Sequence, residues 1–77
     1  MSHAAANAAL KQAVGKYAGF PSTPVIIEGI KHEFIRIMHA DFGIDLRSHL
    51  LDIEIEFDRR GAPWLTIDPD LLNTTVH

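Results

Sequence analysis

The first residues whose types and spacing could do chemistry are Glu28, His32 and His39. On a helix, spacings of four and seven positions place side chains on the same side. Two imidazoles and a carboxylate could hold zinc or nickel there. Arg36 lies in the same stripe, where its positive charge would repel a metal ion, and a solvated helix face is the simpler explanation. Metal binding, or a metal-dependent enzyme, is therefore an alternative interpretation, and no cofactor is expected.

Two further arrangements resemble catalytic motifs without completing them. His32 and Glu33 begin the helix motif of metalloproteases, but Arg36 stands where the second histidine is required. Ser48 and His49 are neighbours in sequence, yet the glycines of a nucleophile elbow are absent and nothing orients the histidine. We therefore expect a protein that is not an enzyme.

Carboxylates alternate with apolar residues along 51–58, and a tryptophan follows at position 64. In an extended strand these carboxylates share one face at intervals of ~6.7 Å, twice the rise per residue. Such a row suits a protein partner with a basic surface, or imitates the backbone of a nucleic acid. A solvated sheet face whose acidic residues oppose aggregation explains the charges alone. Trp64 favours a partner, because an exposed indole within a charged rim is typical of a protein-binding surface.

The predicted partner-binding residues share this wet face. They are Asp52, Glu54, Glu56, Asp58, Trp64 and Thr66. The leading interpretation is a small accessory or regulatory protein that acts by protein–protein interaction. The alternative within the same class is an acidic inhibitor that occupies the groove of a DNA- or RNA-binding protein.

Two helices are expected ahead of this strand. Residues 3–18 are alanine-rich and carry only a thin apolar stripe. Residues 24–42 form a stronger amphipathic helix, with Thr23 as its N-cap and Gly43 as its terminator. Its apolar face consists of Ile26, Ile27, Ile30, Phe34, Ile37 and Met38, with Ile35 and Phe42 at one margin. Residues 44–50 fit a short strand and a turn of helix equally well.

Residues 51–58 and 62–68 are expected to form a β-hairpin. Asp58 begins a type I turn and Gly61 supplies the left-handed position that follows it. A loop over 59–61 then fixes the register. The pairs are Phe57 with Pro63, Glu56 with Trp64, Ile55 with Leu65, Glu54 with Thr66, Ile53 with Ile67, and Asp52 with Asp68. The last pair would bring two carboxylates together, which could share a proton, bind a cation or splay into water.

The length of 77 residues and the absence of cysteine predict a single domain over 1–77 that no disulfide stabilises. The expected fold class is α+β, with both helices covering the apolar face of the hairpin. Because a two-stranded sheet is marginal and leaves its edges unpaired, we expect a homodimer whose hairpins join edge to edge. A pocket for a small molecule at such a dimer interface is a further possibility.

The net charge of −3 is unevenly distributed along the chain. Residues 50–77 hold six acidic residues and two basic ones, so direct binding of nucleic acid is not expected. No apolar run is long enough to span a membrane, and the start lacks the pattern of a secretion signal. We expect a cytoplasmic protein without a membrane contact, ending in a loose tail over 73–77.

Overall fold

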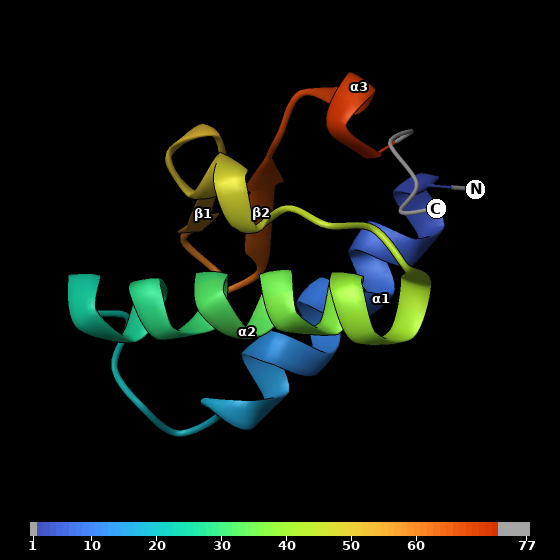
Figure 1. Ribbon diagram of the computed structural model, residues 1–77. Coiled ribbons are helices and arrows are strands. Elements are labelled where there is room, and N and C mark those ends of the chain that lie inside the picture. The colour runs from blue at the N-terminus through green and yellow to red at the C-terminus, as the bar shows by residue number, and fades with distance from the viewer. Residues whose placement is uncertain (1, 73–77) are drawn as a thin grey trace.

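The computed structural model describes residues 2–72 and has an α+β fold, in which two helices are followed by an antiparallel hairpin (Figure 1). The elements in chain order are α1 (Ser2–Lys16), α2 (Pro24–Phe42), the 3₁₀ helix η1 (Arg47–Asp52), β1 (Glu54–Phe57), β2 (Pro63–Thr66) and α3 (Pro69–Leu72). The expected combination of helices and hairpin is confirmed, and the expected tail over 73–77 lies outside the described residues. Within residues 2–72 there is no helix long and apolar enough to cross a membrane.

An alanine-rich stripe of α1 packs against α2. Its buried residues are Ala6, Ala9, Leu10 and Ala13. Because methyl groups occupy little space, the two helix axes can approach closely. The helix ends at Lys16 rather than at residue 18, because the chain turns over residues 17–19. Gly19 ends this turn with a φ of 90°, a backbone conformation that favours glycine.

The boundaries of α2 coincide with those expected from its capping residues. Thr23 Oγ1 accepts a hydrogen bond from the Ile26 amide at 3.4 Å. Gly43 has a φ of 68°, and its amide donates to the His39 carbonyl at 3.2 Å. The buried apolar residues of the helix are Ile30, Phe34, Ile35, Ile37 and Met38. The central part of the predicted apolar face therefore covers the core, with Ile35 included. Ile26 and Ile27 are only half-buried, and Phe42 at the margin is exposed.

Gly29 lies in the second turn of α2, where the Tyr17 ring packs against the helix. A Cβ atom at this position would lie 2.7 Å from the Tyr17 hydroxyl oxygen and 2.9 Å from its Cζ. Both distances are shorter than van der Waals contact allows. A glycine inside a helix costs about 1 kcal/mol relative to alanine, and the tyrosine ring explains why one is tolerated here.

Gly29→Ala is expected to lower the free energy of unfolding of the wild-type chain, because the new methyl group meets the Tyr17 ring. In a chain that also carries Tyr17→Ala, the same change should raise that free energy by about 0.5–1 kcal/mol through helix propensity. Urea denaturation of the four chains of this double-mutant cycle measures both effects. Stabilisation of both backgrounds would mean that the ring moves aside without cost.

Residues 47–52 form the 3₁₀ helix η1, which is kinked at His49. Of the segment 44–50 that the sequence left open, residues 47–50 belong to this helix and residues 44–46 have no regular secondary structure. The expectation that a strand begins at residue 51 is wrong, since Leu51 and Asp52 belong to η1 and Leu51 is 92% exposed. Asp45 supports the start of η1, because its Oδ1 accepts hydrogen bonds from the Arg47 amide at 3.0 Å and from Arg47 Nε at 2.9 Å. The alternation of apolar and acidic residues in the sequence thus includes Leu51, although the strand itself begins only at Glu54.

The hairpin has the expected register, although both strands are shorter than predicted. The paired residues are Glu54 with Thr66, Ile55 with Leu65, Glu56 with Trp64 and Phe57 with Pro63. At the loop, the Asp58 amide donates to the Ala62 carbonyl and the Gly61 amide to the Asp58 carbonyl, both at 3.0 Å. Gly61 has a φ of 81°, as the left-handed position after a type I turn requires. The strands cover 54–57 and 63–66 instead of 51–58 and 62–68.

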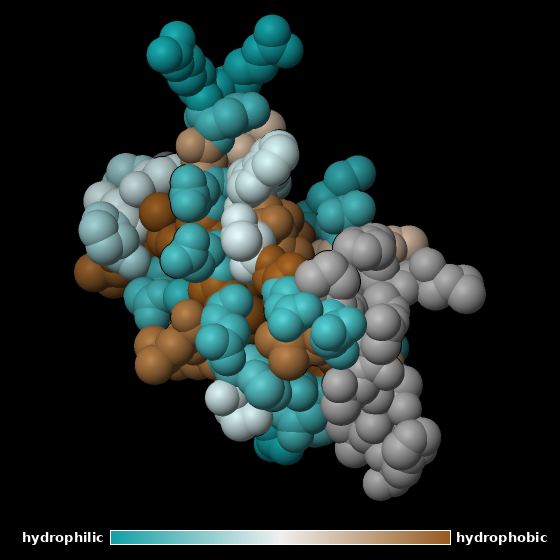
Figure 2. All heavy atoms as spheres, turned by 90° about the horizontal axis from the view of Figure 1, so that it is seen from above, coloured by the Kyte–Doolittle hydropathy of each residue, from teal (hydrophilic) through white to brown (hydrophobic). Residues whose placement is uncertain are grey.

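The hairpin lies over the helix pair, with β1 against α2 and β2 against α1. Apolar side chains from all of these elements form one core cluster. Its largest fully buried members are Phe34, Met38, Leu46 and Ile53. Leu46 and Ile53 flank η1 on either side, so they hold this short helix between α2 and the hairpin. Seen from above, apolar side chains remain visible between hydrophilic ones (Figure 2).

Candidate interaction surface

The outer side of the hairpin carries two carboxylates, an indole and a hydroxyl group. Glu54 and Glu56 on β1 are exposed, and so are Trp64 and Thr66 on β2. Their strand neighbours point to the other side, where Ile55 is buried. We call these four exposed residues the hairpin face. Both strands alternate as expected, so one side of the sheet lines the core and the other is left to solvent.

Trp64 is the most prominent residue of the hairpin face. The residue is 66% exposed, and it lies directly opposite Glu56 in the strand register. Residues in this relation have Cβ atoms about 4.5–5.5 Å apart. An open hollow of about 250 Å³ lies among Glu56, Phe57, Asp58 and Trp64. A cationic side chain placed there would contact the indole and a carboxylate together.

The carboxylates of the hairpin face have no partner within the described chain. Neither Glu54 nor Glu56 forms a salt bridge or a side-chain hydrogen bond with any other residue in 2–72. By contrast, Asp45 Oδ2 lies 2.7 Å from an Arg47 guanidinium nitrogen. The charge of the two glutamates is therefore not compensated locally and remains available to an approaching cation.

Asp58, predicted as part of the same carboxylate row, is engaged in the hairpin loop. Its Oδ1 accepts hydrogen bonds from the Arg60 amide at 2.8 Å and from the Ala62 amide at 2.9 Å. This is the turn-forming use of an aspartate. The residue borders the hollow beside Trp64, but its carboxylate also stabilises the loop.

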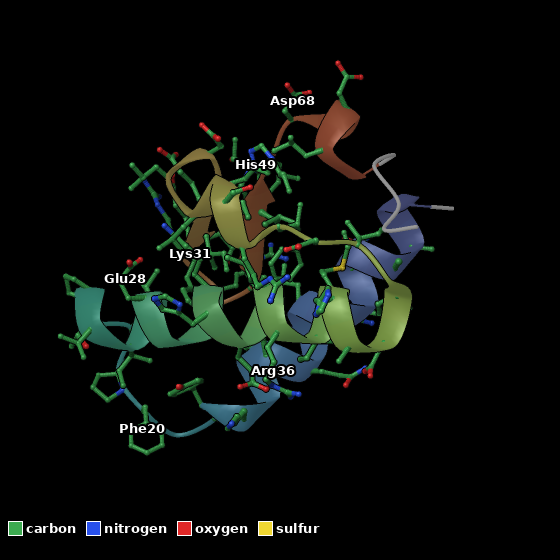
Figure 3. All side chains as sticks on the ribbon, viewed as in Figure 1. Phe20, Glu28, Lys31, Arg36, His49 and Asp68 are labelled. Atoms are coloured by element: carbon green, nitrogen blue, oxygen red, sulfur yellow. The ribbon has the colours of Figure 1, made fainter. Side chains whose placement is uncertain are left out.

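Asp52 and Asp68, expected to face each other across the hairpin, are not cross-strand neighbours. Asp52 lies on η1, where its Oδ2 is 3.3 Å from His49 Nδ1. Asp68 precedes α3, and its Oδ1 accepts a hydrogen bond from the Asp70 amide at 2.9 Å. Figure 3 shows Asp68 beside α3 and His49 on η1. The expected row of four carboxylates is thus reduced to two on β1, because the strand begins after Asp52 and Asp58 turns into the loop.

The stripe of Glu28, His32 and His39 is not assembled as a metal site. Glu28 Oε2 lies 3.2 Å from Lys31 Nζ, and Figure 3 shows both side chains on the same part of α2. Within residues 2–72 there is no group of three His, Cys, Asp or Glu side chains that could hold a metal ion. The metal-binding alternative therefore has no geometric support in the described chain.

Ser48 and His49 do not form a nucleophile–base pair. The His49 ring lies beside Asp52, and across residues 2–72 no hydroxyl group hydrogen-bonds to that ring. A histidine–carboxylate pair without a positioned nucleophile lacks the arrangement needed for nucleophilic catalysis. The pair lies on the exposed surface of η1, and it links neighbouring turns of that helix.

Glu33 is a buried charged residue that sequence reasoning did not single out as important. Its Oε2 lies 3.0 Å from Lys16 Nζ of α1, and its Oε1 accepts a hydrogen bond from Arg36 Nε at 2.7 Å. Glu33 therefore joins α1 to α2 through two basic side chains. The spacing between Glu33 and Arg36 is visible in the sequence, but the contact with Lys16 depends on how the helices pack. Both carboxylate oxygens are engaged, so this residue serves stability.

The stability of the protein is expected to fall in acid because of Glu33. Hydrogen bonds from Arg36 and then Lys16 lower the pKa of this carboxyl below its ordinary value of 4.5. A lowered folded pKa contributes stability that is complete above the unfolded value and is lost as the pH falls through the folded value. In urea titrations from pH 6 downward, the wild type should lose stability more steeply below about pH 4.5 than Glu33→Gln. Parallel curves would contradict this prediction.

Comparisons with protein-family models, with curated protein sequences and with solved structures found no match for this chain. The hairpin face carries charged and aromatic side chains that are exposed and have no partner in residues 2–72. By contrast, Glu33 and the Asp45–Arg47 pair form ion pairs within the molecule. The function is therefore inferred from the geometry and charge of that face.

Proposed function

We propose that the protein is a non-enzymatic interaction module, which binds a basic surface of another protein through the hairpin face. The observation that carries this proposal is the exposed indole of Trp64 directly opposite the unpaired carboxylate of Glu56. Tryptophan is enriched among the residues that dominate binding energy at interfaces. The indole would supply the apolar contact, and the two glutamates would select a positively charged partner.

The charge distribution supports a basic partner rather than a neutral one. Glu54 and Glu56 lie in the acidic part of the chain, and no cation of residues 2–72 forms a salt bridge with either. Complementary charge across an interface accelerates association and suppresses wrong partners. Nucleic-acid mimicry is the weaker proposal, because two carboxylates on one strand make a short imitation of a phosphate backbone.

Replacing Trp64 by alanine is expected to weaken binding of a labelled peptide of alternating glycine and arginine by about 30-fold, the loss typical of a central interface tryptophan. Glu56→Gln should weaken it less, and added salt should reduce the affinity of the wild type. Fluorescence anisotropy of the label measures each affinity. Phe20→Ala is the matched control, since Phe20 is an exposed aromatic residue of the α1–α2 connection. Equal affinity of all four chains would remove the proposal.

The homodimer expected from the sequence stays a prediction. The sheet of the described chain has two strands, so each strand has one edge without a strand beside it. A second copy joined at either edge would give a four-stranded sheet. Sedimentation equilibrium over a range of concentrations measures this association directly.

A further inference from the structure

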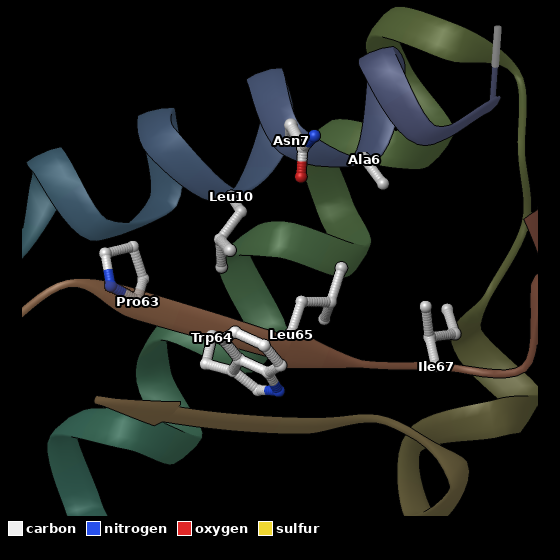
Figure 4. Close-up of a pocket in the computed structure, with 7 residues that line it drawn as sticks. All are labelled: Ala6, Asn7, Leu10, Pro63, Trp64, Leu65 and Ile67. Carbon is white, nitrogen blue, oxygen red and sulfur yellow. The ribbon is translucent and has the colours of Figure 1, made fainter. Parts of the chain in front are cut away.

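A second hollow runs beside the outer edge of β2, and we call it the edge groove (Figure 4). It has a volume of about 290 Å³ and lies between α1 and β2. The residues that matter here are Asn7 and Leu10 from α1 and Pro63, Trp64, Leu65 and Ile67 from the second half of the hairpin. Trp64 borders both the edge groove and the acidic hollow beside Glu56.

The backbone of β2 presents hydrogen-bonding groups at this edge. The Asp58 amide donates to the Ala62 carbonyl, and hydrogen-bonded pairs alternate along an antiparallel ladder. The pair of Ile55 and Leu65 is therefore a non-hydrogen-bonded pair, in which the Leu65 amide and carbonyl point away from β1. No backbone or side-chain group of residues 2–72 bonds to them. Pro63 has the same outward orientation, and its missing amide hydrogen removes no bond to β1.

We propose that the edge groove binds an extended peptide of alternating apolar and basic residues, which adds a third strand to the sheet at Leu65. Strand addition takes affinity from main-chain hydrogen bonds and specificity from pockets for alternate side chains. A residue opposite Leu65 turns its side chain toward Leu10 and Leu65, where the groove is apolar. Its neighbours turn to the other side, beside Trp64. An arginine there can stack on the indole and extend toward Glu56.

The negative charge of the hairpin face and the proline at the edge of β2 favour such a peptide over a second copy of this chain. Two copies related by a two-fold axis at Leu65 would place Pro63 of each copy opposite Ile67 of the other copy. Because proline has no amide hydrogen, the shared ladder would lack two amide donors. Their acidic hairpin faces would also form one continuous surface, which like-charge repulsion opposes. With a basic peptide the shared ladder lacks at most one amide donor, that of Pro63. The basic side chains of the peptide also neutralise the charge of Glu54 and Glu56.

The test uses a short peptide of alternating valine and arginine. The expected contacts of its arginines with Trp64 and Glu56 rest on the proposed function of the hairpin face. Two further peptides carry N-methyl groups on the valine amides alone or on the arginine amides alone. Because a strand offers alternate amides to one edge, one methylated set should weaken binding about tenfold and the other should not. If methylation of the valine amides weakens binding, the third strand is antiparallel to β2. If methylation of the arginine amides weakens binding, the third strand is parallel to β2. Slower hydrogen exchange of the Leu65 amide in the complex is the second expected result.

The outcomes separate this inference from the function on which it rests. If the valine–arginine peptide binds with dependence on Trp64 but both methylated peptides bind equally and Leu65 exchange is unchanged, the hairpin face is functional and strand addition is wrong. If Trp64→Ala and Glu56→Gln leave the affinity for this peptide unchanged, the proposed function of the hairpin face is contradicted, and so are the arginine contacts of this inference. If a peptide with glutamate in place of arginine binds as tightly as the valine–arginine peptide, the two glutamates of the hairpin face do not select a basic partner. A Leu65 amide that is already protected in a free dimer would assign the edge to a second copy.

Discussion

Phe34→Ala is expected to leave the chain without a cooperative unfolding transition at room temperature. Phe34 is completely buried near the centre of α2, and it belongs to the one core cluster to which α1 and the hairpin also contribute. Truncating a buried phenylalanine to alanine costs about 3–5 kcal/mol. A core of this size supplies about 3–5 kcal/mol of net stability, so the substitution removes most or all of it. Near-ultraviolet circular dichroism and a urea titration would reveal the loss.

A control on the same helix makes the Phe34 result specific. Val25 lies in the first turn of α2 and is 78% exposed, so Val25→Ala removes methyl groups that pack against little. Its effect should stay within about 0.5 kcal/mol, while alanine also favours the helix. A Phe34→Ala chain that unfolds at the wild-type urea concentration would contradict the placement of this ring in the core.

Ile53→Ala is expected to cost about 2–5 kcal/mol, whereas Leu51→Ala should change stability by less than about 0.5 kcal/mol. The sequence pattern assigned both residues to one apolar strand face. In the structure, Ile53 is fully buried after η1, and Leu51 at the end of η1 is almost wholly exposed. The cost of Ile53→Ala comes from the cavity it leaves beneath β1.

Urea denaturation of the two alanine variants decides between a strand and a 3₁₀ helix at residue 51. Equal destabilisation by both would mean that Leu51 also packs in the core, as in the longer predicted strand. Leu51→Asp is a useful third variant, because an exposed site accepts the charge and a buried one does not. It should keep the wild-type transition.

Local chemistry made α2 and the hairpin loop predictable from the sequence. Thr23 and Pro24 fix the start of the helix and Gly43 its end, through contacts within a few residues. Asp58 and Gly61 likewise fix the loop. Once the loop is set, the register follows, because a slip by one residue would turn every apolar side chain to the wrong face.

Features that depend on distant parts of the chain were not predictable in the same way. The 3₁₀ helix η1 is held by Leu46 and Ile53 in the core and by Asp45 at its start. The ion pair between Glu33 and Lys16 exists only because α1 packs across α2. Neither feature leaves a periodic pattern that a reading of neighbouring residues could detect.

The candidate site was predictable in part. Alternation placed Glu54, Glu56, Trp64 and Thr66 on one exposed side, as the structure has them. It also placed Asp52 there, because alternation does not show where a strand begins. The edge groove could not be foreseen, since one wall comes from α1 and the other from β2.

The position of Trp64 has a practical consequence for spectroscopy. It is the one tryptophan in the sequence, and its indole is largely in water in the folded protein. Its emission should therefore change little when the chain unfolds, so intrinsic fluorescence is a poor probe of denaturation. The same property makes the emission a selective signal for occupancy of the hairpin, because a blue shift would report a molecule that covers the ring.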